Sequence, residues 1–395
     1  LGERSESARG EGAKRLIELA IRDFRLSGVH LAAEQKARFQ AIMEELSMTE
    51  AGFEQNVLDS AAAWSLHIAE PSRVNGIPAL VLEPAAEQAR EAGKSGWLFT
   101  LDQPTYVGVV THADDRELRQ AVYRGWVTRA SDEADFSPGH DNSRLIEKIL
   151  ALRHEAAGII GYPNFAAYSL ATKMAKSVDE VREFLIELVR HSRDAARREL
   201  RELETFAGTT LEPWDIAYYS EKLRDQRYSI SDEALRPYFP LPKVLTGLFS
   251  VVEKLYGIRI EPVAGIAAWE SHVGYYRLID ASGREVGSFF TDFYARSTKR
   301  SGAWMDQCLN RLRHDADLQL PVAHLVCNFS LPTADRPTLI THDEVVTVFH
   351  EMGHVLHHLL TRIEYPSVGG INGVPWDAVE LPSQFMETFA WEPEV

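Results

Sequence analysis

The sequence contains little cysteine. Only two cysteines, Cys308 and Cys327, occur in 395 residues. This number is far below what a disulfide framework needs, and nothing pairs the two thiols into a metal-binding motif. A small disulfide-stabilised scaffold is therefore excluded, and we expect a reducing compartment, the cytoplasm.

Positive charge and long apolar runs are also scarce. The chain carries 42 Lys and Arg against 58 Asp and Glu, a net charge of −16. This balance disfavours nucleic acids and anionic membranes as partners. No apolar run approaches the length of a membrane span, and residues 1–14 are polar without a targeting pattern. The length suggests two or three domain equivalents with a sizeable core.

The stretch from Thr341 to Leu360 is predicted to form one amphipathic helix. Thr341 and Glu344 have the spacing of a capping box, so the helix is expected to begin there. Apolar side chains then recur at intervals of three and four, which buries one broad face: Val345, Val348, Phe349, Met352, Leu356 and Leu359.

Inside this helix stands His350-Glu351-x-x-His354. Histidines four residues apart leave the same side of a helix and can bind one metal ion. Glu351 is then beside the metal, where it can take a proton from bound water. The alternative is two partly exposed histidines on an ordinary helix, but an inner face rich in Val and Leu disfavours unpaired His and Glu. The motif therefore predicts a catalytic metal site.

A catalytic zinc needs three protein ligands and one open position. A metzincin would have Gly at position 357 and His at position 360, and His357 with Leu360 excludes that class. Glu364 follows His354 by ten residues and is not expected to turn back to the metal. The carboxylates available towards the C-terminus are Glu364, Asp377, Glu380, Glu387, Glu392 and Glu394.

The turn-rich segment 366–375 can reverse the chain before a second helix. Pro382 indicates that this helix begins near Leu381, which leaves Glu380 at its mouth. Glu380 and Glu387 are seven residues apart and would share a helical face. The pattern alone does not rank these two carboxylates as the third ligand.

These motifs resemble the thimet-oligopeptidase family of zinc peptidases. The resemblance rests on F-H-E-M-G-H followed by V-E-L-P-S-Q-F-M-E, and it extends over the segments H-H-L-L-T-R-I-E, G-V-P-W-D-A and P-W-D-x-x-Y-Y to essentially the whole chain. Met352 stands where the family usually has Phe, an apolar exchange that changes little.

The resemblance implies that Glu380 is the third ligand, completing a site for one zinc ion per chain with His350 and His354. Glu387 becomes a candidate to orient a ligating histidine, and Asp343 is another. For both residues a solvated surface carboxylate is the competing interpretation. The family's deep channel implies short unfolded peptides as substrates, signal-peptide fragments among them.

The expected fold is mainly α (α+β), a zincin-like helical metallopeptidase with a small β-sheet next to the H-E-x-x-H helix. Helices are predicted within 12–70 and at 145–157, 181–203 and 244–256; strands are predicted at 97–101, 106–110, 275–280, 286–294 and 322–329. The resemblance places an edge strand beside the zinc. Lys299 and Arg300 could bind a substrate carboxylate, but plain surface charge is the favoured interpretation.

We expect a partial helical N-terminal region at residues 1–112 and a zinc metallopeptidase region at 113–395 that lacks its C-terminal part. In the family, Tyr and His side chains beyond the zinc helices stabilise the oxyanion. We therefore expect this chain alone to bind zinc but to hydrolyse peptides weakly or not at all.

The sequence thus predicts a monomeric zinc endopeptidase for short oligopeptides, with Glu351 as general base. One rival is a non-catalytic helical binding protein with a vestigial or structural zinc site. Retention of Glu351 argues against it, because a structural site needs a fourth ligand and no base. A second rival is a zinc hydrolase acting on something other than peptides.

Overall fold

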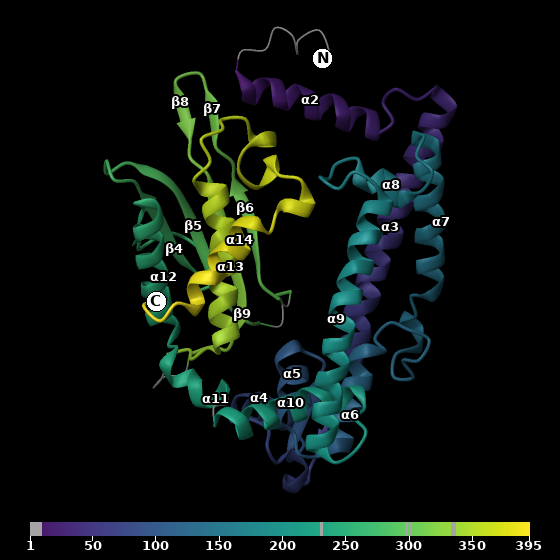
Figure 1. Ribbon diagram of the computed structural model, residues 1–395, viewed down its shortest axis with the longest axis vertical. Helices are drawn as coiled ribbons and strands as arrows, with labels where there is room; N and C mark the ends of the chain where they lie inside the picture. The colour runs from purple at the N-terminus through teal and green to yellow at the C-terminus, as the bar shows by residue number, and fades with distance from the viewer. Residues whose placement is uncertain (1–9, 230–231, 297–298, 301, 333–336) are drawn as a thin grey trace. The chain divides into compact units, whose positions relative to one another are not determined.

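The protein is mainly helical and carries a five-stranded mixed sheet (Figure 1), which confirms the predicted fold class. The computed structural model describes residues 10–229, 232–296, 299–300, 302–332 and 337–395. The chain divides into two compact units. The sheet unit comprises Leu1–Ser27, Thr172–Met174 and Asp232–Val395, and the helical unit comprises Gly28–Ala171 and Ala175–Ser231. The predicted boundary between residues 112 and 113 separates functional regions, whereas these two units are defined by their compactness. The boundary therefore stays a prediction.

The helical unit is an assembly of helices with one two-stranded sheet. Its helices are α3 (Ala33–Ala63), α4 (Ala79–Glu91), α5 (Gln103–His112), α6 (Arg116–Val127), α7 (Ser143–Ile160), α8 (Phe165–Leu170), α9 (Val178–Ala207) and α10 (Pro213–Tyr228), and its strands are β1 (Ser65–Ile68) and β2 (Trp97–Thr100). Helices α3 and α7 lie side by side and bury Phe39, Ile42 and Leu46 against Ile149 and Leu152.

The strand predicted at residues 106–110 is wrong, because this segment lies inside helix α5. The carboxylate of Asp102 accepts a hydrogen bond from the Thr105 backbone N–H at 2.8 Å. Pro104 occupies the first turn, where its missing N–H costs nothing. This N-terminal cap outweighs the β propensity of the Val-rich run that follows. The neighbouring strand prediction is confirmed by β2.

The P-W-D segment has a structural role in the helical unit. Asp215 is fully buried and pairs with Arg119 at 2.9 Å and with Arg116 at 2.7 Å. Burial raises the pKa of Asp215, but the hydrogen bonds from Arg116, Arg119 and the Glu212 backbone N–H outweigh it and lower the pKa. This buried ion pair joins the start of α10 to α6.

The sheet unit contains the other α-helices and the other strands. Its helices are α2 (Glu11–Leu26), α11 (Asp232–Leu235), α12 (Leu241–Tyr256), α13 (His342–Leu359) and α14 (Leu381–Glu387), with short 3-10 turns η3 (Arg236–Tyr238), η4 (Pro366–Val368), η5 (Gly370–Gly373), η6 (Trp376–Ala378) and η7 (Thr388–Trp391). Its strands are β3 (Arg259–Pro262), β4 (Gly274–Ile279), β5 (Glu285–Tyr294), β6 (Trp304–Leu309), β7 (Leu312–His314), β8 (Asp317–Gln319) and β9 (Val322–Phe329).

The five-stranded sheet has the order β3-β4-β5-β9-β6. Strands β5 and β9 are parallel, and the other neighbouring pairs are antiparallel. The predicted hairpin of β4 and β5 and the predicted strand β9 are confirmed, whereas β6 was not anticipated. Helices α12 and α13 pack their apolar side chains on one face of the sheet. Among the described strands, β6 is an edge with β9 on one side.

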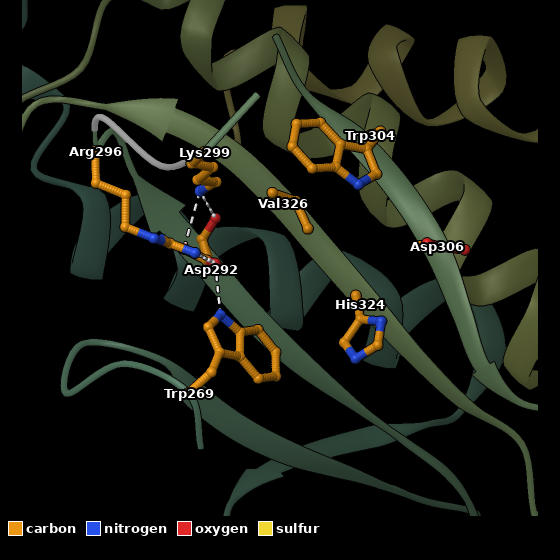
Figure 2. Close-up of a pocket in the computed structure, with 8 residues that line it drawn as sticks. All are labelled: Trp269, Asp292, Arg296, Lys299, Trp304, Asp306, His324 and Val326. Atoms are coloured by element: carbon orange, nitrogen blue, oxygen red, sulfur yellow. Dashed lines mark hydrogen bonds and ion pairs between the residues drawn. The ribbon is translucent and has the colours of Figure 1, made fainter. Parts of the chain in front are cut away.

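The other face of the sheet carries a shallow pocket of about 270 Å³ around Asp292, shown in Figure 2. Asp292 accepts hydrogen bonds from Trp269, Arg296 and Lys299 at 2.8 to 2.9 Å. The Lys299 side chain is only 4% exposed and also donates to the carbonyl of Cys327. The favoured interpretation of Lys299 as surface charge is therefore wrong, because its ammonium group is bound within the sheet unit. Arg300 is exposed.

Candidate metal centre

Helix α13 places the histidine motif against the core of the sheet unit. The predicted capping box is present, because the Thr341 hydroxyl accepts from Glu344 N–H and the Glu344 side chain accepts from Thr341 N–H. Val348, Phe349 and Met352 are at most 1% exposed in the cluster that α13 forms with β9 and α12. Burial of this face fixes the rotation of α13 about its axis and therefore the direction of the two histidines.

The predicted ligands His350, His354 and Glu380 come together. Their ligand atoms lie within 4.8 Å of one another. A Glu380 carboxylate oxygen lies 3.2 Å from His350 Nε2 and 3.0 Å from His354 Nε2. Burial lowers the pKa of His354, which favours the neutral imidazole that a metal ligand requires.

Glu380 reaches the histidines because the chain reverses after α13 and α14 packs beside it. As predicted, the residue stands at the mouth of the second helix, as the N-cap of α14. The Ser383 hydroxyl, fully buried, lies 2.9 Å from both the backbone carbonyl and a carboxylate oxygen of Glu380. Ser383 thereby orients the Glu380 side chain, a role that the sequence reasoning missed.

The other candidate carboxylates differ in whether they reach the two histidines. An oxygen of Glu387 lies 2.6 Å from His350 Nδ1, the nitrogen that faces away from Glu380. Asp343 is exposed in the first turn of α13, and the described structure does not bring it to the cluster. Glu364 is engaged by Arg313 at 2.6 and 2.7 Å. His354 Nδ1 is buried without a hydrogen-bond partner among the described residues.

Glu351 lies beside the cluster and is 5% exposed. Burial raises its pKa to about 7, while the nearby His350 opposes this shift and Glu380 adds to it. The Met305 backbone N–H on β6 approaches this carboxylate and acts to lower its pKa. Its Oε2 is buried without a hydrogen-bond partner from any described residue. A buried, unpaired carboxylate oxygen next to three ligand atoms is unusual unless a further group binds there.

Gly353, inside the motif, is a second residue whose role the sequence reasoning missed. A Cβ atom at this position would lie 2.5 Å from both the Pro382 carbonyl oxygen and the Ser383 Cα. Both contacts are backbone atoms of α14, so the two helices could not keep their separation. The absence of a side chain at Gly353 is what allows Glu380 to reach the histidines.

Replacing Gly353 by alanine is expected to destabilise the chain by about 1–3 kcal/mol, because α14 must move away. Zinc affinity should fall at least tenfold, since Glu380 moves with α14. Urea unfolding and a competitive zinc titration measure the two effects. Gly158→Ala in α7 is the control, because a Cβ atom there meets nothing within 4 Å. Equal behaviour of the two variants would contradict the close helix approach.

The donor set fits zinc. Two imidazole nitrogens and one carboxylate oxygen match a three-ligand catalytic site with one open position. The unpaired Glu351 oxygen fits a water at that position. The hydrogen bond that His350 Nδ1–H donates to the Glu387 carboxylate, on the far side of the ring, is the usual support of a ligating histidine. In the described part of the chain, no helix is long and apolar enough to cross a membrane.

Comparison with known proteins gives consistent matches. The sequence model of Peptidase family M3 matches residues 109–395. The chain is 47% identical to oligopeptidase A of Escherichia coli over 387 residues, which covers 96% of this chain and 57% of the relative. It is 41% identical to organellar oligopeptidase A, chloroplastic/mitochondrial, of Arabidopsis thaliana, covering 98% of this chain and 50% of the relative.

A solved structure described as PZ peptidase A with inhibitor 2 aligns with a TM-score of 0.45 and 14% identity, covering 96% of this chain and 56% of that chain. The chain therefore spans about half the length of the curated relatives that it matches.

Proposed function

Because this chain belongs to peptidase family M3, we propose that it carries the metal centre of a zinc-dependent oligopeptidase that hydrolyses short peptides. The observation that carries the proposal is the convergence of His350, His354 and Glu380 beside the buried carboxylate of Glu351. The names of the relatives agree with this assignment. One zinc ion per chain follows from one such cluster among the described residues.

When bound, zinc would polarise the scissile carbonyl and lower the pKa of the attacking water towards neutrality. His350, His354 and Glu380 would hold it, and Glu387 would fix the ring of His350 through Nδ1. Glu351 would accept the proton of the attacking water and then transfer it to the leaving amine. Its burial keeps bulk water from competing for the carboxylate.

The edge strand β6 supports binding of an extended peptide. Its Met305 backbone N–H contacts Glu351, so the strand runs beside the proposed general base. An extended peptide that paired with this edge would bring its backbone carbonyls close to the metal centre. Such pairing depends on main-chain atoms and therefore tolerates many side chains. Short unfolded peptides, signal-peptide fragments among them, are the substrates we propose.

Replacing Glu351 by glutamine is expected to lower the kcat/KM of the chain's weak hydrolysis of quenched-fluorescent peptides by about 10²- to 10⁴-fold, because the amide cannot accept the proton. Zinc content should stay at the level of the unaltered chain. The exposed Glu392→Gln is the matched control and should keep the starting activity. A Glu351→Gln variant as active as the unaltered chain would contradict the assigned role.

The same assay separates the proposal from its rivals. A structural or vestigial zinc site predicts zinc binding with no metal-dependent hydrolysis and no peptide binding. Binding of peptides to the zinc-loaded chain with slow, zinc-dependent cleavage would instead exclude a purely structural zinc site. Cleavage of non-peptide esters, but of no peptide, would favour a different zinc hydrolase.

A further inference from the structure

His358 lies one helical turn after His354 and is not used by the proposed mechanism. Its side chain is 1% exposed, and its Nε2 lies 3.0 Å from the backbone carbonyl oxygen of Leu309. Since that oxygen can only accept, the ring must carry its proton on Nε2. Nδ1 has no hydrogen-bond partner among the described residues. Leu309 is the last residue of the edge strand β6.

The edge strand is therefore fastened to α13 at two places. The first is the polar contact between Met305 N–H and Glu351, where α13 and β6 lie together, and the second is the hydrogen bond from His358 to Leu309. From Glu351 to His358 the helix rises about 10 Å, and from Met305 to Leu309 the strand extends about 13 Å. The two contacts are therefore similarly spaced on both elements, which run in the same direction between them. Together they set how far the strand stands from the metal centre.

The turn after α13 supports the same end of β6. Gly370 has a left-handed backbone, with φ of 58°, and a Cβ atom there would lie 2.7 Å from His358 Nδ1. The backbone of η5 thus closes over the His358 ring. From the same turn, Asn372 Nδ2 donates to the side chains of Gln307 and Asn310 at 2.6 and 3.0 Å. His358 and Asn372 consequently hold the end of the edge strand from two segments.

We propose that His358 is a positioning residue. It holds the edge strand β6 at the distance from α13 at which an extended peptide can pair with the strand over the metal centre. This inference rests on the proposed function. In this proposal His358 binds neither the metal nor the peptide, and it acts through the carbonyl of Leu309. Loss of its hydrogen bond should therefore weaken peptide binding and leave zinc binding unchanged.

The test compares His358→Ala with His358→Gln, whose amide can still donate to Leu309, in the zinc-loaded chain. In the alanine variant, amide hydrogen exchange of residues 304–309 should become about tenfold faster, the size expected for one buried hydrogen bond. The Kd of a fluorescent octapeptide should rise by a similar factor. The glutamine variant should stay within about threefold on both readouts, and zinc content should be equal in all.

His314→Ala is the matched control, because His314 is an exposed histidine of the same unit. Asn372→Ala provides a second variant should His358→Ala not fold, with the same direction of effect on residues 304–309. Unchanged exchange and affinity in His358→Ala would overturn the proposal, and so would loss of zinc in that variant. If the unaltered chain binds zinc but no peptide, the proposed function fails, while the exchange contrast still decides whether His358 positions β6.

Discussion

Replacement of Glu380 by alanine is expected to lower bound zinc from one ion per chain to less than about a tenth. The variant removes the only carboxylate oxygen that, among the described residues, lies within 3.2 Å of both histidine nitrogens. A two-histidine site lacks the third ligand that a catalytic zinc requires. Metal content by mass spectrometry after dialysis, on folded protein verified by circular dichroism, measures the effect.

Two controls make this result specific. Glu392→Ala removes an exposed carboxylate near the same end of the chain and should keep zinc. Glu387→Gln removes the charge behind His350 and should weaken zinc affinity by about 10- to 100-fold without abolishing binding. Zinc retained in Glu380→Ala but lost in Glu387→Gln would move the third ligand to Glu387, and the ligand assignment would have to be revised.

The second large effect is expected from Asp292→Ala, which should lower the free energy of unfolding by about 3–5 kcal/mol. The substitution leaves the ammonium group of Lys299, 4% exposed, without its carboxylate partner. It also removes the acceptor of the Arg296 guanidinium and of the Trp269 indole N–H. Urea unfolding at pH 7 is the measurement. Asp306→Ala, an exposed residue lining the same pocket, should change stability by no more than about 0.5 kcal/mol.

The same ion pair has a defined pH dependence. Burial raises the pKa of Asp292, but hydrogen bonds from Arg296, Lys299 and Trp269 outweigh it and hold the pKa well below its usual range. A lowered folded-state pKa adds stability above the unfolded pKa of about 3.9, and this stability is lost as the pH falls further. The difference between the unaltered chain and Asp292→Ala should be constant from pH 7 to 5 and shrink below pH 4. A constant difference down to pH 3 would contradict the ion pair.

Most of the metal centre could be predicted from the spacing of neighbouring residues in the sequence. Positions 350, 351 and 354 are separated by less than two helical turns, so their relative directions follow from helix geometry alone. The capping box at Thr341 and Glu344 is equally local and is present as predicted. Ranking Glu380 above Glu387 needed the family resemblance, because both share a helical face. In the structure the two carboxylates approach opposite nitrogens of the same His350 ring.

The two wrong predictions and the missed role of Gly353 share one physical cause, which is that the deciding partner lies outside the pattern considered. The segment 106–110 has strand-like composition, but the cap at Asp102 starts a helix. Lys299 looks like surface charge because its acceptors, the Asp292 carboxylate and the Cys327 carbonyl, lie 7 and 28 residues away and meet it only in the folded sheet. The role of Gly353 depends on the backbone of a different helix. Contacts of this kind cannot be read from periodicity.

By itself, the sequence determined the class of chemistry, because the residue types and intervals of the H-E-x-x-H helix specify two ligands and a base over a short stretch of chain, whereas the choice of Glu380 as third ligand came from the family resemblance. It also determined that the fold is mainly helical with a small sheet. Only the tertiary structure decided how the second helix packs on Gly353, which nitrogen of His350 each carboxylate meets, and how His358 fastens the edge strand. These features depend on chain reversals over tens of residues, whose geometry is set by packing of the whole unit rather than by any local preference.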